Sequence, residues 1–281
     1  MIIDAHTHIL PKEIIRNKDR YIETDATFAD LFCVDNCKFS TCEQLIQSME
    51  NSGVSKSIIM GMGWTNSDLN RYVNEYLLDA SVRYPKQLIP FTGIIPSFFQ
   101  KDLMEAERCL NEGSKGFGEL HATQQNIDIT NVKLMEPYMS LLMERGLPIT
   151  IHCSEPVGHS YPGKGTTTPN ILEKFVQNFP NNKIVMAHWG GGLPFFELMP
   201  EVKSLFRNVY YDTAATPFLY DHTIFTIGTK AAGADKILFG SDFPLLSPQK
   251  IIRQIDNSDL DLDEKKLVLN KNTLNMLQSD I

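Results

Sequence analysis

The sequence predicts a (β/α)8 barrel, and three observations support this fold class. Across 281 residues, eight short apolar runs alternate with longer amphipathic segments, the pattern of eight βα units. The runs are nearly continuous in Ile, Val, Leu and Phe, as parallel strands covered on both faces are. The alternative, a doubly wound open sheet, would usually carry a Gly-rich phosphate-binding turn after its first strand, and the sequence has no such motif. We therefore expect one barrel domain over residues 1–281.

The elements follow one another in the order that this fold requires. The apolar runs place the strands at 2–6, 54–60, 88–94, 114–119, 148–152, 183–188, 208–212 and 236–241. Amphipathic patterns predict helices near 41–52, 67–83, 99–112, 131–145, 168–179, 194–206, 217–228, 248–256 and 263–278. Ser40 and Glu43 fit the S-x-x-E capping box of the first helix. The connections 9–40 and 153–167 are expected to be long loops at the C-terminal face of the barrel, where barrel active sites lie.

Composition limits the classes of partner and location. Lys and Arg number 26 against 34 Asp and Glu, a net charge of −8, and no basic cluster offsets it, which argues against a nucleic-acid partner. No apolar run reaches the length of a membrane span, and the N-terminus lacks the basic start of a signal peptide. Five cysteines without paired spacing are typical of a reducing compartment. We expect a cytoplasmic protein that acts on a small molecule, and a homo-oligomer is compatible with the sequence.

Histidines and carboxylates fall at the ends of the predicted strands. The six residues that share this position are His6, His8, Glu119, His152, His188 and Asp242. Side chains alternate with period two along a strand, so the two histidines of strand 1 point the same way, into the mouth of the barrel. Asp4 has the same parity one layer below and is expected to orient one of them. The separation of 54 residues between His188 and Asp242 spans two units, so strand 7 contributes nothing to this set.

A cluster of imidazoles and carboxylates facing an aqueous cavity suits a divalent ion such as Zn²⁺. Three or four protein ligands that leave one position open to water are typical of a catalytic site. A single histidine at a strand end is usually structural, and H-x-H alone is a weak signal. Six such residues in register favour the functional interpretation. The sequence leaves open whether the site holds one ion or two.

Five segments of the chain, DAHTHIL, KGFGELH, ITIHCSEP, VMAHWGG and ILFGSDFPL, resemble the motifs of the amidohydrolase superfamily. The nearest resemblance is to the amidohydrolase-related branch, amidohydrolase 2, which includes aminocarboxymuconate-semialdehyde decarboxylase and pyrone-dicarboxylate lactonase. The resemblance implies a metal-dependent barrel whose ion is surrounded by His6, His8, His152 and Asp242. It also implies that His188 binds a second metal or holds the nucleophilic water.

The sequence departs from two-metal relatives that use a carbamylated Lys at the end of strand 4. Lys115 lies four residues before Glu119, roughly 13 Å lower along a strand, and is not expected to reach the site. Glu119 takes that position, as in relatives with a Glu there, and is predicted to contact the metal or its water. Three further residues are predicted to contact the substrate: His121, Glu155 and His159.

The predicted activity is that of a metal-dependent hydrolase that cleaves an amide, ester or lactone. The ion lowers the pKa of its bound water to about 7, Asp242 acts as general base and His188 orients the nucleophile. The alternative is a lyase, either a non-oxidative decarboxylase or a hydratase. A substrate carboxylate would then need a cation, for which Lys164 and His159 are the candidates. No Arg closely follows a strand end, which slightly favours hydrolysis.

Overall fold

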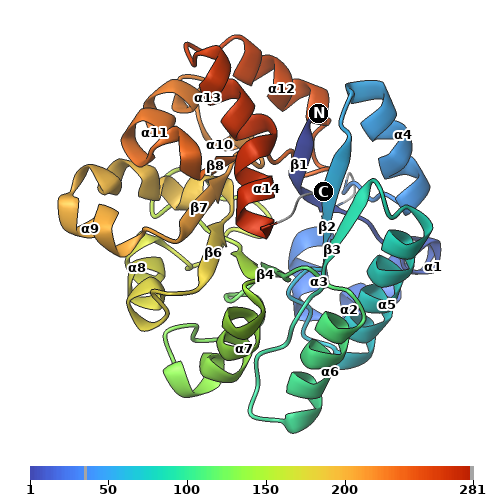
Figure 1. Ribbon diagram of the computed structural model, residues 1–281. Coiled ribbons are helices and arrows are strands. Elements are labelled where there is room, and N and C mark those ends of the chain that lie inside the picture. Colours follow the sequence, from blue (N-terminus) through green and yellow to red (C-terminus); the bar gives the residue numbers. More distant parts are fainter. Residues whose placement is uncertain (35–36, 279–281) are drawn as a thin grey trace.

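Eight parallel strands form the centre of the molecule in the computed structural model, which describes residues 1–34 and 37–278 (Figure 1). They are β1 (Ile3–His8), β2 (Lys56–Met60), β3 (Leu88–Phe91), β4 (Phe117–Leu120), β5 (Pro148–Ile151), β6 (Lys183–Met186), β7 (Val209–Asp212) and β8 (Ile237–Leu238). Each overlaps one apolar run of the sequence. Because these runs are buried on both faces, nearly every strand residue is buried.

The strands pair in chain order and close on themselves. Three of them form the sheet β1-β2-β3, and five form the sheet β4-β5-β6-β7-β8. Parallel bridges join the two sheets, one between Thr92 and Phe117 and the other between Thr7 and Phe243. The Ala5 backbone N–H also donates to the Phe239 carbonyl, at 2.7 Å. The ring of strands confirms the predicted (β/α)8 barrel.

Helices surround the strands, as Figure 1 shows. The main ones are α4 (Cys42–Ser52), α5 (Ser67–Arg83), α6 (Gln100–Asn111), α7 (Val132–Arg145), α8 (Pro169–Asn178), α11 (Ile224–Ala232) and α12 (Pro248–Asp256). The shorter ones are α9 (Pro200–Leu205), α10 (Thr216–Leu219), α13 (Leu262–Lys266) and α14 (Asn272–Leu277). Three further turns of 3-10 or π helix are η1 (His188–Leu198), η2 (Ala234–Lys236) and η3 (Leu267–Lys271).

Four local predictions differ from the structure. The expected helices 194–206 and 217–228 are each divided, the first between η1 and α9 and the second between α10 and α11. The connection 9–40 is not a plain loop, because it contains α1 (Lys12–Arg16), α2 (Lys18–Thr24) and α3 (Ala26–Phe32). The Asp25 side chain caps α3 by accepting from the Phe28 N–H, at 2.8 Å. The capping box of α4 consists of Thr41 and Gln44, one residue later than Ser40 and Glu43. The connection 153–167 is irregular, as expected.

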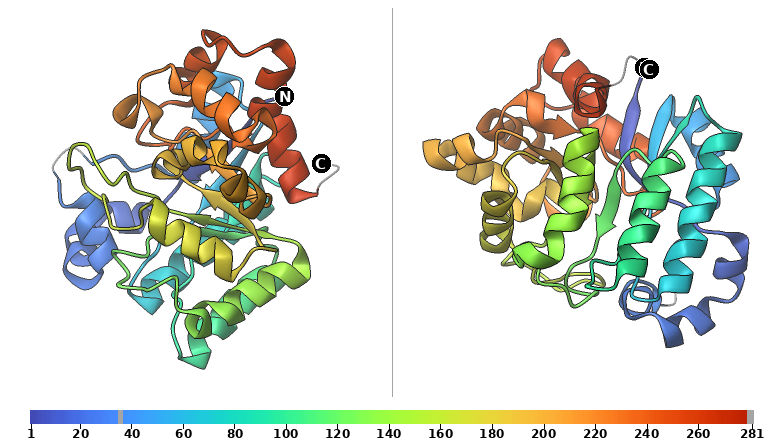
Figure 2. Two further views of the ribbon diagram at one scale, coloured as in Figure 1. Left: turned by 90° about the vertical axis from the view of Figure 1, so that its left-hand side faces the viewer. Right: turned by 60° about the horizontal axis from the view of Figure 1, so that its bottom comes forward.

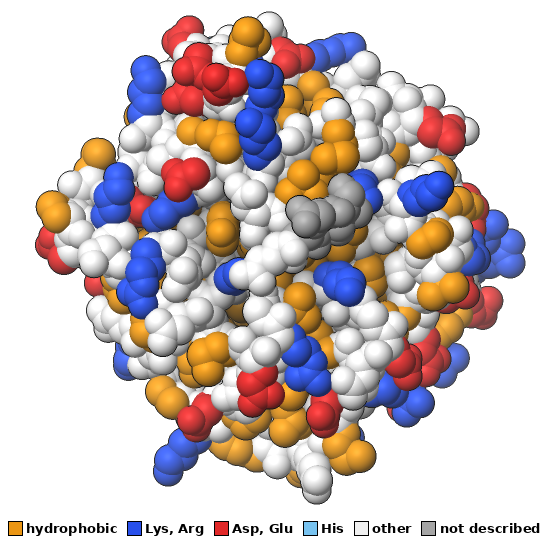
Figure 3. Space-filling view, in the orientation of Figure 1, with side chains coloured by type: hydrophobic (Ala, Val, Ile, Leu, Met, Phe, Trp, Pro, Cys, Tyr) orange, Lys and Arg blue, Asp and Glu red, His pale blue; other side chains and the backbone are white. Residues whose placement is uncertain are grey.

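The two ends of the barrel differ. Apolar side chains fill its interior and include Ala5, Ile58, Met60, Phe91 and Leu238. Met276 of α14 belongs to the same cluster, so α14 packs over the N-terminal end of the strands (Figure 1). On this face acidic and basic side chains are interspersed (Figure 3). No helix in the described part of the chain is long and apolar enough to cross a membrane. The opposite, C-terminal end carries the polar side chains described next.

Candidate metal centre

His6 and His8 are buried side by side at the end of β1, with their Nε2 atoms 3.1 Å apart. Each ring is held through its other nitrogen. His6 Nδ1 lies 2.8 Å from Asp212 Oδ2, and His8 Nδ1 lies 3.2 Å from the Met60 carbonyl. These acceptors place the ring protons on Nδ1, so the two Nε2 lone pairs face each other. A cation bound to both lone pairs would relieve that repulsion. The distance fits such an ion, because two ligand atoms that each lie about 2.0–2.1 Å from a tetrahedral ion are roughly 3.3 Å apart.

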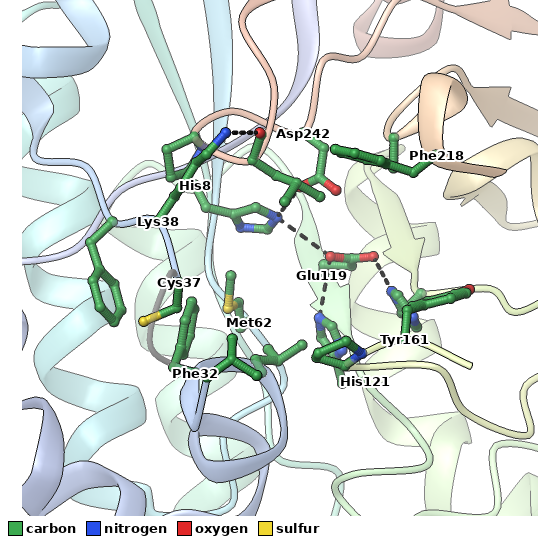
Figure 4. Close-up of a pocket in the computed structure, with 18 of the residues that line it drawn as sticks. His8, Phe32, Cys37, Lys38, Met62, Glu119, His121, Tyr161, Phe218 and Asp242 are labelled. Atoms are coloured by element: carbon green, nitrogen blue, oxygen red, sulfur yellow. Dashed lines mark hydrogen bonds and ion pairs between the residues drawn. The ribbon is translucent and has the colours of Figure 1, made fainter. Parts of the chain in front are cut away.

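Glu119 lies at the centre of the cluster, with its two oxygens turned to different histidines (Figure 4). Oε2 is 3.4 Å from Nε2 of both His6 and His8. Oε1 is 2.8 Å from His152 Nδ1 and 3.2 Å from His188 Nε2. One carboxylate therefore connects the β1 histidines with the histidines that follow β5 and β6. Lys115, by contrast, is exposed ahead of β4, as the sequence predicts.

Asp242 follows β8 and completes the cluster from the side of the barrel opposite to Glu119 of β4. Its backbone φ of 64° lies in the left-handed region that non-glycine residues seldom adopt. A hydrogen bond of 3.0 Å from its backbone N–H to the His6 carbonyl fixes this turn against β1. Oδ1 lies 3.8 Å from His6 Nε2 and 3.7 Å from His8 Nε2. At 15% exposure, this side chain is the most accessible carboxylate of the cluster and faces the cavity.

The structure thus brings together all six residues that the sequence places at strand ends. Within the described residues, three overlapping sets have ligand atoms within 4.8 Å of one another: His6 with His8 and Glu119; His6 with His188 and Asp242; Glu119 with His152 and His188. The first set, joined by Asp242, could hold one divalent ion. The third set shares only Glu119 with the first, so the geometry also offers a place for a second ion.

Burial and neighbouring charges together set the pKa values of the candidate ligands. Burial raises the pKa of Glu119, but the surrounding histidines outweigh it and hold that pKa well below its usual value. Burial lowers the pKa of His152 to about 4, so this imidazole is neutral at pH 7. For His188, burial also lowers the pKa, yet Glu119 and Asp242 bring it to about 9. Burial lowers the pKa of His6 as well, but Asp212 and Glu119 outweigh it and hold that pKa well above its usual value. Ionised Glu119 and neutral His152 are thus in the form that binds a metal, whereas His6 and His188 lose a proton when a metal binds.

Asp212, at the end of β7, is a site residue that the sequence analysis missed. It is fully buried, and its Oδ2 accepts from His6 Nδ1 while its Oδ1 accepts from the His188 backbone N–H, at 2.9 Å. The sequence predicts that Asp4 orients a β1 histidine, but its Oδ1 accepts from the backbone N–H groups of His6 and Ser241. The available signal was the Asp that ends the apolar run 208–212.

Replacing Asp212 with Asn is expected to weaken metal binding about 10- to 100-fold, the usual effect of losing a carboxylate behind a histidine ligand. The amide is isosteric but carries no charge to hold the Nδ1–H of His6. Competition with a chromophoric chelator measures the affinity. Asp235→Asn, an exposed position on η2, is the matched control. Equal affinity in Asp212→Asn and wild type would show that His6 needs no such support.

A cavity of about 370 Å³ opens above the cluster. Its floor contains cluster residues such as His8, Glu119 and Asp242, and much of its wall is apolar (Figure 4). The apolar wall includes Leu31, Phe32, Phe39, Met62, Phe218 and Leu245. The connection between β1 and α4 supplies the first three of these, so its helices shape the cavity.

The predicted substrate contacts have different outcomes. His121 and His159 line the cavity, and the ring of His121 stacks on His152 with centroids 4.5 Å apart. Glu155 is not among the lining residues, and its carboxylate is occupied by two tyrosine hydroxyls. Lys164 donates to two carbonyls of its own loop rather than lining the cavity. Among the described residues, Lys38 is the one Lys or Arg in the lining, and the sequence analysis did not single it out.

The fold and this cluster define a member of the amidohydrolase family, and residues 3–278 match that family. One curated relative is the 2-amino-3-carboxymuconate-6-semialdehyde decarboxylase of Dictyostelium discoideum. It is 22% identical over 99% of this chain and 92% of its own length.

Solved structures of two decarboxylases share the fold. The 5-carboxyvanillate decarboxylase of Novosphingobium aromaticivorans, solved as a D314N mutant with bound manganese and 3-methoxy-4-hydroxy-5-nitrobenzoic acid, superposes with a TM-score of 0.81 at 17% identity. The superposition covers 99% of this chain and 97% of the decarboxylase chain. The 2,6-dihydroxybenzoate decarboxylase of Rhizobium gives a TM-score of 0.73 at 14% identity, covering 99% and 98%.

Proposed function

We propose that this protein is a metal-dependent, non-oxidative decarboxylase of a small carboxylate. The observation that carries the proposal is the Glu119-centred cluster at the floor of a largely apolar cavity that contains one lysine. A carboxylate held in such surroundings loses hydration, and its negative charge passes to the substrate carbon as carbon dioxide leaves. The decarboxylases similar to this chain support the lyase alternative better than the hydrolase that the sequence favoured.

In this proposal His6, His8, Glu119 and Asp242 hold the ion, with His152 and His188 close enough to join them. Nitrogen and oxygen ligands of this kind suit Zn²⁺ or Mn²⁺. When bound, the ion would supply a positive charge that anchors the substrate oxygens and stabilises the negative charge left on the substrate as carbon dioxide leaves. The apolar wall excludes water from the reacting carbon.

The chain itself supplies the proton in this proposal. When the carbon–carboxylate bond breaks, its electron pair stays on the carbon, carbon dioxide leaves and a proton forms the new C–H bond. Asp242 is the most exposed carboxyl of the cluster and faces the cavity. In this proposal Oδ1 is turned to the ion, and Oδ2 takes up a proton from water in the cavity and passes it to the carbon. Candidate ligand atoms of His188 and Asp242 lie within 4.8 Å of each other, close enough for a protonated His188 to attract the carboxylate.

Product analysis tests this function. Metal-reconstituted protein is incubated with a panel of aromatic and unsaturated carboxylic acids and, in parallel, with lactones, esters and amides of similar size. The proposal predicts carbon dioxide from at least one acid and no hydrolysis of its neutral counterparts. Ring opening or amide cleavage without carbon dioxide would refute it.

A second candidate, hydrolysis of a C–N or C–O bond, is favoured by the two ligand sets that meet at Glu119. Two ions a few ångströms apart are a common arrangement for activating water in hydrolases. Metal stoichiometry separates the candidates in combination with the product analysis. Two equivalents of tightly bound metal together with hydrolysis products would favour this second function.

Lys38→Met is expected to raise KM about 10- to 100-fold for a carboxylate substrate while changing kcat little. The reason is that, within the described residues, Lys38 is the one Lys or Arg lining the cavity and donates to the Leu245 carbonyl alone, at 2.7 Å. An ammonium has three N–H groups, so others are left for an anion. Steady-state kinetics measure the effect. Lys101→Met on the outer surface of α6 is the control. An unchanged KM would remove Lys38 from substrate binding.

A further inference from the structure

The connection between β5 and α8, residues 152–168, forms part of the cavity wall. His159, Tyr161 and Pro162 of this segment line the cavity, although the segment has no helix or strand of its own. Figure 2 shows it, in yellow-green, on the same side of the barrel as the blue helices that follow β1. An irregular segment of this length needs specific attachments if it is to form a defined surface.

The first attachment is made by Glu155. Its Oε2 accepts from the Tyr161 hydroxyl at 2.9 Å, and its Oε1 accepts from the Tyr220 hydroxyl at 3.0 Å. Tyr220 directly follows α10, so this half-buried carboxylate joins the wall segment to the β7 side of the barrel. Burial and the charge of Glu155 raise the pKa of both tyrosines, which keeps the hydroxyls protonated as donors. No Lys or Arg of the described chain pairs with Glu155.

The second attachment holds Gly163, close to Tyr161 in the segment, through Gln124, which follows β4. Its Nε2 donates to the Gly163 carbonyl at 3.1 Å and to Asp30 Oδ2 at 2.9 Å. Asp30 belongs to α3, whose Leu31 side chain lies so close to Gly163 that a Cβ there would meet it at 2.7 Å. The segment is therefore held on one side by the β7 connection and on the other by the helices after β1.

We propose that Glu155 is a positioning residue for substrate binding, which acts by fixing this wall through Tyr161 and Tyr220. The role within catalysis rests on the proposed function, but the anchoring itself does not. Direct contact of Glu155 with a carboxylate substrate is disfavoured, because like charges repel and both of its oxygens already accept a tyrosine proton. Loss of Glu155 loosens the wall of the cavity and leaves the metal ligands in place.

Hydrogen–deuterium exchange of the full-length, metal-loaded protein tests the anchoring without any substrate. In Glu155→Ala, we expect peptides within residues 153–167 to exchange roughly tenfold faster, with β-strand peptides unchanged. Glu155→Gln keeps two hydrogen bonds, because a tyrosine hydroxyl can also accept from the amide, and should restore most of the protection. Glu107→Ala, exposed on α6, is the control. Wild-type exchange of this segment in Glu155→Ala would overturn the proposal.

Kinetics with a carboxylate identified by the product analysis test the link to binding. Glu155→Ala and Tyr220→Phe are expected to raise KM about tenfold with kcat within about twofold and with unchanged metal content. A purely structural role would lower the active fraction, and hence kcat, without changing KM; that result would overturn the positioning role. If no carboxylate is a substrate, the proposed function fails, whereas the exchange experiment still decides whether Glu155 anchors the wall.

Discussion

Replacing His6 and His8 together with alanine is expected to remove the bound divalent ion and reduce turnover to background. The two Nε2 atoms, 3.1 Å apart, are the closest pair of histidine nitrogens in the cluster, and no other side chain at the end of β1 can replace them. Elemental analysis of the purified variant measures the loss. His222→Ala, a position 62% exposed and away from the cluster, should keep its full metal complement.

Because both histidines are buried, the double variant also needs a test of its fold. Circular dichroism and size-exclusion chromatography should match wild type, and a His6→Asn/His8→Asn variant, which stays polar in the same space, should lose metal to the same extent. A folded double-alanine variant with a full complement of metal would contradict the assignment of these residues as ligands.

Asp242→Asn is expected to lower turnover by about 10²- to 10⁴-fold, the usual contribution of a positioned acid–base group. The amide keeps the size of the side chain and one ligand oxygen, but it cannot hold or release the proton. The variant should therefore remain folded and retain much of its metal. Turnover is compared at matched metal content, with Asp221→Asn, 69% exposed, as the control. Near-wild-type turnover in metal-replete Asp242→Asn would shift the proton-transfer role to His188.

The six strand-end residues could be predicted from the sequence because two periodicities determine their positions. Alternation along β1 puts His6 and His8 on one side, and repetition of the βα unit brings the ends of β4, β5, β6 and β8 to one face. Both the alternation and the repeat can be recognised in the sequence, and few arrangements of strands in a barrel are compatible with both.

Asp212 was not among the predicted site residues. It ends β7, the same kind of position that marks the other residues, but the spacing from His188 to Asp242 suggests that strand 7 is skipped. Its contacts are with His6 Nδ1 and the His188 backbone, so the expectation that strand 7 contributes nothing was wrong. The sequence did not predict that Lys38 lines the cavity or that Glu155 lies outside its lining. Both residues lie on long connections whose path depends on tertiary contacts. Three helices in the connection 9–40 bring Lys38 to the cavity, and tyrosine hydroxyls draw Glu155 away from it.

The most direct test of the central claim is release of labelled carbon dioxide from a carboxyl-¹³C substrate as metal is titrated into chelator-treated protein. Metal-dependent decarboxylation predicts no label from the metal-free protein and a rate that rises with metal until the cluster is filled. The released label should equal the substrate consumed. Turnover that is unaffected by chelation, or substrate loss with the label still in the carboxylate, would contradict the account.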